Sequence, residues 1–201
     1  MLKKLIFCCS ILAACMLSAA PKWEDLPQIA PGVKFDPETA PAYPGMKVSI
    51  IQRPDQQYLF LHDTAITEHK GILYAAWYNC PAEECKGTSV IRGRKSTDGG
   101  KTWSKAWEFG RIGSPPHLLL RKDGSVVVTY GRRRAPFGNR ASISYDGCRT
   151  FGEEYILSET HCGDLGYPAT TELADGSLVT VYYQPYEKDN RTSIFFTKWR
   201  P

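Results

Sequence analysis

One short stretch occurs twice in the chain and constrains its fold more than any other feature. Residues 96–103 read Ser-Thr-Asp-Gly-Gly-Lys-Thr-Trp, and residues 144–151, 48 positions later, read Ser-Tyr-Asp-Gly-Cys-Arg-Thr-Phe. Both copies keep serine, aspartate, glycine, threonine and an aromatic residue at the same offsets. The aspartate can accept hydrogen bonds from the backbone N–H groups that follow it, and glycine allows a positive φ. Each copy therefore predicts a tight turn between two strands.

A second regularity comes from three turn glycines, Gly71, Gly124 and Gly176, at intervals of 53 and 52 residues. Each is closely followed by a run of apolar, β-branched and aromatic residues that is typical of a strand. A fixed period of this size indicates a repeat architecture. In each unit we expect one strand before the glycine, one after it, and a third that leads toward the repeated turn. The nine expected strands are 65–68, 72–78, 89–94, 117–121, 126–130, 140–144, 169–173, 178–183 and 193–199.

The repeated turn would lead to a fourth strand in each of the first two units. Four antiparallel strands in a repeat of this length are typical of a propeller blade. We therefore predict an all-β fold, a partial β-propeller of about three four-stranded blades, with an all-β sandwich as the alternative. The third unit ends after three strands. The alternating run Val48–Gln52 predicts one more strand, which could supply the missing fourth strand and cover the open edge.

The start of the chain has the pattern of an export signal. Two lysines precede an apolar run over 5–17, and a small-residue cleavage signal ends at Ala20. The run is too short to predict a membrane span. Leu12–Cys15 also fits a bacterial lipobox, in which Cys15 would be lipidated. Both alternatives predict an exported protein, periplasmic or secreted.

After the signal at 1–20, a proline-rich stretch at 21–46 predicts an extended lead-in, and 47–201 would form the propeller domain. The net charge of +4 falls to about +2 without the two signal lysines, which indicates neither a nucleic-acid partner nor a membrane-surface binder. Export permits disulfides, and we expect one between Cys80 and Cys85 on a single loop. Their spacing is not a zinc pattern, so we expect no metal and no other cofactor.

The repeated turn resembles the Asp box, or BNR repeat, of sialidases and related propellers. The resemblance covers nearly all of the chain from Val48 onward. It is most specific over 113–201, through Ser-Pro-Pro-His, Asp-Leu-Gly-Tyr-Pro and Trp-Arg-Pro. It implies a six-bladed ring whose central blades are missing here, with the break near 109–111.

The resemblance also implies roles for three residues. Sialidases hold the substrate carboxylate with three arginines, and a tyrosine, paired with a glutamate, is the nucleophile. A neutral tyrosine avoids the repulsion that the substrate carboxylate would exert on a carboxylate nucleophile. Tyr167 stands where the family has its nucleophile, and Arg140 matches the last clamp arginine. Arg133 could also reach the anion, because a guanidinium pairs with a carboxylate through two parallel hydrogen bonds. A packed tyrosine and solvated arginines remain the alternatives.

Other positions depart from the sialidase pattern. His62 stands near the place of the first clamp arginine, and Glu83 or Glu84 could replace the acid/base aspartate. The glutamate partner of the tyrosine and the middle arginine belong to the missing blades. We therefore expect an exo-α-sialidase-like protein for sialylated or related acidic glycans that is inactive as this chain. The alternatives are a non-catalytic carbohydrate-binding propeller and a remnant of a longer sialidase gene.

Overall fold

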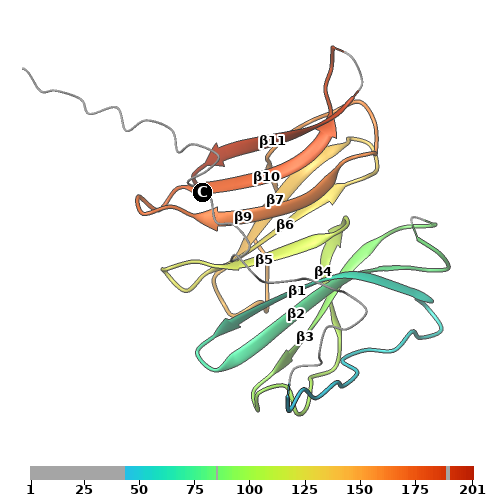
Figure 1. The fold of residues 1–201 in the computed structure, drawn as a ribbon, viewed down its shortest axis with the longest axis vertical. Helices are drawn as coiled ribbons and strands as arrows, with labels where there is room; N and C mark the ends of the chain where they lie inside the picture. The colour runs from blue at the N-terminus through green and yellow to red at the C-terminus, as the bar shows by residue number, and fades with distance from the viewer. Residues whose placement is uncertain (1–43, 85, 189–190) are drawn as a thin grey trace, which may run out of the picture. The chain divides into compact units, whose positions relative to one another are not determined.

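A computed structural model describes residues 44–84, 86–188 and 191–201 and divides the chain into two units, 1–48 and 49–201. In the first unit the described residues, 44–48, are exposed. The described part of the second unit contains three antiparallel sheets (Figure 1), which we call blade 1, blade 2 and blade 3.

Blades 1 and 2 each have four strands, and blade 3 has three. Blade 1 has the order β1 (Phe60–His69), β2 (Ile72–Cys80), β3 (Val90–Ser96), β4 (Trp107–Ile112). Blade 2 has the order β5 (Pro116–Leu120), β6 (Val126–Arg132), β7 (Gly138–Ser144), β8 (Tyr155–Ile156). Blade 3 has the order β9 (Gly166–Glu172), β10 (Leu178–Pro185), β11 (Thr192–Trp199). The nine strands expected from the sequence are confirmed, and the fold is an all-β partial propeller.

The two Asp boxes form the same hydrogen bonds in blades 1 and 2. In blade 1, Asp98 accepts hydrogen bonds from the Thr102 N–H at 2.9 Å and the Thr102 hydroxyl at 2.6 Å. In blade 2, Asp146 accepts the same two hydrogen bonds from Thr150, also at 2.9 and 2.6 Å. These hydrogen bonds to the charged form lower the pKa of both carboxyls. The repeated stretches are therefore two copies of one turn, as predicted.

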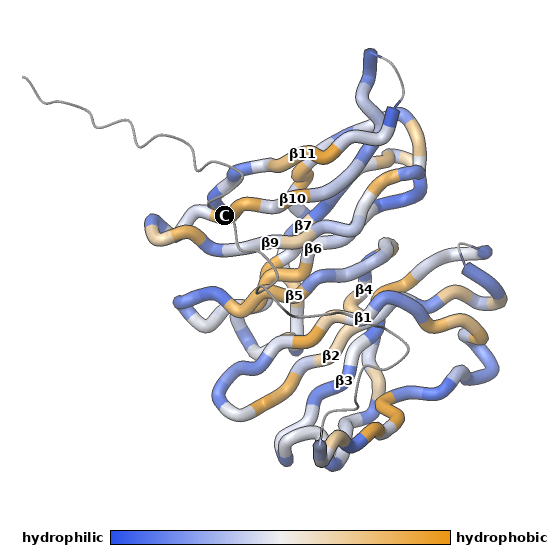
Figure 2. The backbone as a smooth tube through the Cα atoms, viewed as in Figure 1, coloured by the Kyte–Doolittle hydropathy of each residue, from blue (hydrophilic) through white to orange (hydrophobic). Residues whose placement is uncertain are grey.

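The blades pack through apolar faces. Side chains of blade 1 and blade 2 share one core, and a second core joins blade 2 to blade 3; apolar segments of the strands are orange in Figure 2. The first core is formed by Tyr74, Ala76, Ile91, Phe109, Leu118, Val126, Val128, Tyr130 and Cys148. The second is formed by Val127, Ala141, Ile143, Leu157 and Leu178. Alternate residues of β6 face opposite cores, as the pleat of a strand requires.

The prediction that Val48–Gln52 is a strand closing blade 3 is wrong. This run has no strand pairing, and the Ile51 carbonyl accepts a hydrogen bond from Arg94 of β3 at 2.9 Å. Asp55, a little further on, forms an ion pair with Arg92 of β3 at 2.8 Å. Residues 50–55 therefore lie on blade 1, and β11 remains the last strand of blade 3. Two arginine side chains hold this segment in place of a strand ladder.

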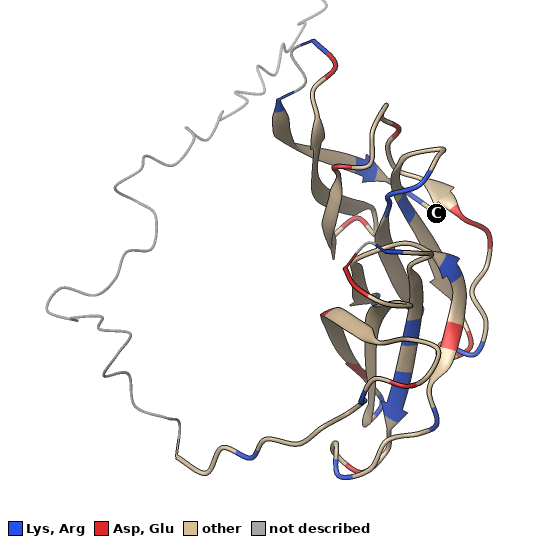
Figure 3. Ribbon diagram, turned by 90° about the vertical axis from the view of Figure 1, so that its right-hand side faces the viewer, with Lys and Arg blue, Asp and Glu red and all other residues tan. Residues whose placement is uncertain are grey.

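The expected export signal, Cys15 and the start of the lead-in lie outside the described residues, and so does Cys85 of the expected disulfide. Among the described residues, no helix is long and apolar enough to cross a membrane. Lysine and arginine are interspersed with aspartate and glutamate along the described strands and loops (Figure 3).

Candidate functional site

Tyr167 lies at the start of β9, where the backbone departs from regular strand geometry. Its φ is +48°, and the β9–β10 register shifts between Val181 and Tyr183 on the opposite strand. Such bulges redirect side chains, and strained backbone of this kind is concentrated at functional sites. The Tyr167 side chain is 48% exposed. The irregular backbone therefore directs an aromatic ring to the surface.

Arg133, from the loop after β6, supports this ring. Its guanidinium lies 5.3 Å from the centre of the Tyr167 ring. Its Nε donates to the Leu165 carbonyl at 2.9 Å, and its Nη2 donates to the Tyr183 hydroxyl at 3.1 Å. The Tyr183 hydroxyl in turn donates to Asp164 at 2.9 Å. Burial, followed by this hydrogen bond to a carboxylate, raises the pKa of Tyr183 to about 12. Arg133 is thus a fixed link between blade 2 and blade 3.

Blade 1 contributes a second group of polar side chains. A register shift in β1 lies between His62 and Thr64, and Asp63 between them has a φ of +44°. The Nδ1 atom of His62 lies 3.3 Å from Asp63 Oδ2, 3.5 Å from Glu84 Oε1 and 3.1 Å from the Tyr78 hydroxyl. Tyr78 donates to Glu84 Oε1 at 3.1 Å. A histidine, two carboxylates and a phenol therefore meet at one end of β1.

Each group contributes one side chain, Asp63 or Tyr167, to a cavity of about 250 Å³. Its lining includes Asp63 from blade 1, Pro116 and His117 from blade 2, and Tyr167 from blade 3. Burial raises the pKa of Tyr167, the negative charges of Asp63 and Glu84 raise it further, and Arg133 opposes the rise. The charges of Asp63, Glu84 and Arg133 therefore all act on this one tyrosine. We call Tyr167, Arg133, Asp63, Glu84 and His62 the Tyr167 site.

Two residues named from the sequence lie elsewhere. Arg140 is 1% exposed, and its guanidinium donates to the Ser158 carbonyl at 2.7 Å and the Pro136 carbonyl at 3.3 Å. Its Nε is 3.8 Å from Glu154, so its partners in the described structure belong to blade 2 and its adjoining loops. Glu83 is exposed, and its backbone carbonyl accepts a hydrogen bond from Lys86. Of the predicted residues, the structure pairs Tyr167 with Arg133 and His62 with Glu84.

Three residues around the site, Asp63, Asp164 and Tyr183, were not predicted from the sequence. Asp63 directly follows His62, but its role depends on a bulge that the alternation of β1 does not reveal. Asp164 lies in the Asp-Leu-Gly-Tyr-Pro motif, three residues before Tyr167, so this motif was the available signal. Tyr183 is 16 residues beyond Tyr167 and meets it only through the β9–β10 hairpin.

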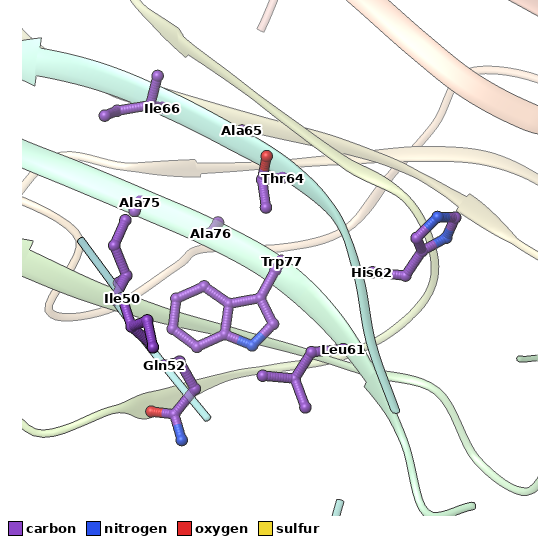
Figure 4. A pocket seen from close by; sticks show the side chains of 11 residues that line it. Ile50, Gln52, Leu61, His62, Thr64, Ala65, Ile66, Ala75, Ala76 and Trp77 are labelled. Atoms are coloured by element: carbon purple, nitrogen blue, oxygen red, sulfur yellow. The ribbon is translucent and has the colours of Figure 1, made fainter. Parts of the chain in front are cut away.

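A second cavity, of about 390 Å³, lies on blade 1 away from blade 2. Ile50 and Gln52 form one side of it, and Ile66 and Trp77 lie on the sheet (Figure 4). The lining is mainly apolar, and its polar groups include His62 of the Tyr167 site. The cavity separates residues 50–52 from β1.

Comparison with known proteins shows the class of fold. No family model and no curated protein matches the sequence. A Dyadobacter fermentans protein of unknown function has a similar structure, with a TM-score of 0.61 and 24% identity, over 74% of this chain and 40% of that one. An α-L-arabinanase of Penicillium chrysogenum, complexed with arabinobiose, has a TM-score of 0.59 and 16% identity, over 75% and 49% of the two chains.

A third similar structure is the GH93 α-L-arabinofuranosidase of Fusarium graminearum, also in complex with arabinobiose. Its TM-score is 0.55 and its identity 17%, over 74% of this chain and 48% of that one. This chain therefore has the fold of β-propeller glycoside hydrolases. It spans less than half the length of each of these three proteins.

Proposed function

We propose that this chain is a carbohydrate-binding part of a glycoside-hydrolase-type propeller and that the Tyr167 site is its sugar subsite. One observation carries the proposal: a half-exposed tyrosine of blade 3 lines one cavity with Asp63 of blade 1 and lies beside a fixed arginine of blade 2. All three blades contribute to this site. Ligand sites in folded proteins combine apolar surface with a few placed polar groups in this way.

The side chains suit a polyhydroxylated ligand. The ring of Tyr167 offers an apolar face to the C–H groups of a sugar, and its hydroxyl can donate or accept a hydrogen bond. Ionised Asp63 and Glu84 can accept hydrogen bonds from sugar hydroxyls. The solved arabinan-degrading proteins of similar fold carry arabinobiose in their structures, which supports a carbohydrate as the ligand class.

As the specific ligand we propose sialic acid or a related acidic sugar, on the basis of the sialidase resemblance and of Arg133 beside Tyr167. In a complete ring, Tyr167 would be the nucleophile and a neighbouring carboxylate its base. The raised pKa of Tyr167 keeps its hydroxyl protonated at neutral pH, so attack would require this base. Glu84 and Asp63 are the two candidates, and both would also repel an acidic sugar. We therefore expect weak binding of sialosides by the chain itself.

Calorimetric titration of the purified chain with methyl α-sialoside and with arabinobiose tests two claims. The first is that the chain binds a carbohydrate, and the second is that this carbohydrate is an acidic sugar. Tyr167→Ala should reduce binding of the sugar at least about tenfold, since it removes the ring and one hydroxyl. Tyr145→Ala is the matched control, because Tyr145 is 72% exposed in the turn of the second Asp box. Unchanged binding in Tyr167→Ala would show that the sugar binds elsewhere.

The variant Arg133→Gln tests whether the preferred ligand is acidic or neutral. It should weaken binding of the sialoside more than binding of arabinobiose, because a guanidinium pairs with a carboxylate. Equal loss for both sugars, or binding of arabinobiose alone by the unaltered chain, would contradict the acidic ligand and leave the carbohydrate site standing. The melting temperature of Arg133→Gln reports whether the hydrogen bond from Arg133 to the Leu165 carbonyl is needed for folding.

A further inference from the structure

The outer face of blade 3 is an apolar surface that no other blade covers in the described structure. Val181 of β10 pairs with Phe196 of β11, and Tyr183 pairs with Ile194. Val181 is 43% exposed, Phe196 69% and Ile194 81%. We call the face of a blade toward the next blade in the chain its forward face, and the opposite one its rear face. Val181, Ile194 and Phe196 lie on the forward face of blade 3.

The corresponding faces of the other two blades are buried. On the forward face of blade 1, Tyr74 and Ala76 are 4% and 0% exposed, and blade 2 covers them. On the forward face of blade 2, Val127 and Ile143 are 0% and 2% exposed, and Leu178 of blade 3 packs on them. At both junctions within the chain, a forward face is therefore covered by the rear face of another blade.

One rear face is also open, that of blade 1. Ile66 of β1 is 60% exposed there, and Thr64 beside it is exposed as well. The cavity of about 390 Å³ lies on the same face, between β1 and residues 50–52 (Figure 4). Trp77 at its base is 4% exposed because residues 50–52 cover the outer part of this face. In the part of the chain that the structure describes, no blade covers the region nearest β1.

We propose that two copies of this chain close one ring, with the forward face of blade 3 of each copy packed on the rear face of blade 1 of the other. The three blades of the described structure are fewer than a propeller needs to close on itself, since propellers have about four to eight. Two copies related by a two-fold axis give six blades and two identical junctions, which leaves no forward or rear face open. At each new junction a forward face then packs on a rear face, as at the two junctions within the chain.

The proposal does not depend on the ligand, because it is based on the two open faces alone.

Light scattering coupled to gel filtration, together with sedimentation equilibrium, tests the proposal. The monomer of all 201 residues has a mass of 22.5 kDa, and the purified chain should have twice the mass of its monomer. Phe196→Asp and Ile66→Asp should each reduce the mass to that of the monomer, because each places a charge in both junctions. Tyr145→Asp, on an exposed residue of an Asp-box turn, should leave the dimer intact. Ile194→Asp replaces Phe196→Asp if circular dichroism shows that the latter is unfolded.

Mixing the two monomeric variants gives the sharpest test. A pair formed from Phe196→Asp and Ile66→Asp has both charges in one junction and two unaltered faces in the other. A dimer should therefore reappear in the mixture, at a mass that neither variant reaches alone. A monomeric unaltered chain would overturn the proposal. So would a dimer that Phe196→Asp disrupts and Ile66→Asp does not, because this indicates pairing of blade 3 with blade 3. Polydisperse large species would indicate that the ring does not close.

Discussion

At the scale of single residues, short polar turns join the strands, and several of these turns rest on an aspartate and a serine. In the second Asp box, Ser144 donates to Asp146 at 2.8 Å and accepts a hydrogen bond from the Cys148 N–H at 2.9 Å. Outside the boxes, Asp123 and Asp175 accept hydrogen bonds from Ser125 and Ser177 two residues later. The hydrogen bonds from Ser177 hold the pKa of Asp175 at about 2. These contacts are local in sequence, which is why the turns could be predicted from it.

Ser144→Ala should lower the free energy of unfolding by about 1–3 kcal/mol, because Ser144 is 1% exposed and its loss leaves a buried N–H without this acceptor. Thr97→Ala, at an exposed position of the first box, should change it by less than about 0.5 kcal/mol. Urea unfolding followed by tryptophan fluorescence measures both. Equal effects would show that the buried hydroxyl does not stabilise the turn.

His117 should make stability depend on pH. Burial lowers the pKa of His117 below its ordinary value of 6.5, and its Nδ1 accepts a hydrogen bond from the Thr170 N–H at 3.4 Å. Between the folded and unfolded pKa values the unfolded chain binds more protons, so stability falls as the pH drops below about 6.5. The melting temperature should decrease between about pH 7 and about pH 5, and less steeply in His117→Gln. Parallel curves for the two proteins would exclude His117 as the cause.

The candidate site was only partly predictable from single residues. Tyr167, Arg133, His62 and Glu84 were named because a family resemblance marks their places. Asp63 was missed because its position depends on a bulge and a positive φ, which a non-glycine residue in an alternating strand does not indicate. The prediction for Arg140 did not anticipate that carbonyl groups around blade 2 would surround its guanidinium.

At the scale of strands and blades, the hairpins around the turn glycines followed from the sequence, and the packing of segment 48–52 did not. Alternation reports that a segment has one apolar side, but not which edge or face receives it. Arg94 and Arg92 of β3 decide this by binding Ile51 and Asp55. Contacts between segments about 40 residues apart are not encoded by a local pattern.

Leu178→Ala tests the junction between blades 2 and 3. Leu178 is fully buried against Val127 and Ile143, so the cavity left by truncation should cost about 2–5 kcal/mol. Ile156→Ala, at a residue of β8 that is 61% exposed, should cost less than about 1 kcal/mol. Chemical denaturation of the two variants gives the comparison. A small effect of Leu178→Ala would mean that blade 3 contributes little to the cooperative unit.

At the scale of the molecule, three blades of a glycoside-hydrolase-type propeller line a common cavity, with Asp63, His117 and Tyr167 among the lining residues. The chain spans less than half the length of the solved proteins of similar fold described above. In the described structure no other blade covers the forward face of blade 3 or the rear face of blade 1, and a second copy is our proposal for covering them. The central claim is that a sugar binds where the three blades meet.

The most direct measurement is a crystal structure of the chain in complex with a sialoside or arabinobiose. The account predicts sugar density against the ring of Tyr167, within hydrogen-bonding distance of Asp63 or Glu84. For the sialoside, the carboxylate should lie toward Arg133. Sugar bound only in the apolar cavity beside Trp77, or no sugar at Tyr167 under conditions where calorimetry detects binding, would contradict the central claim.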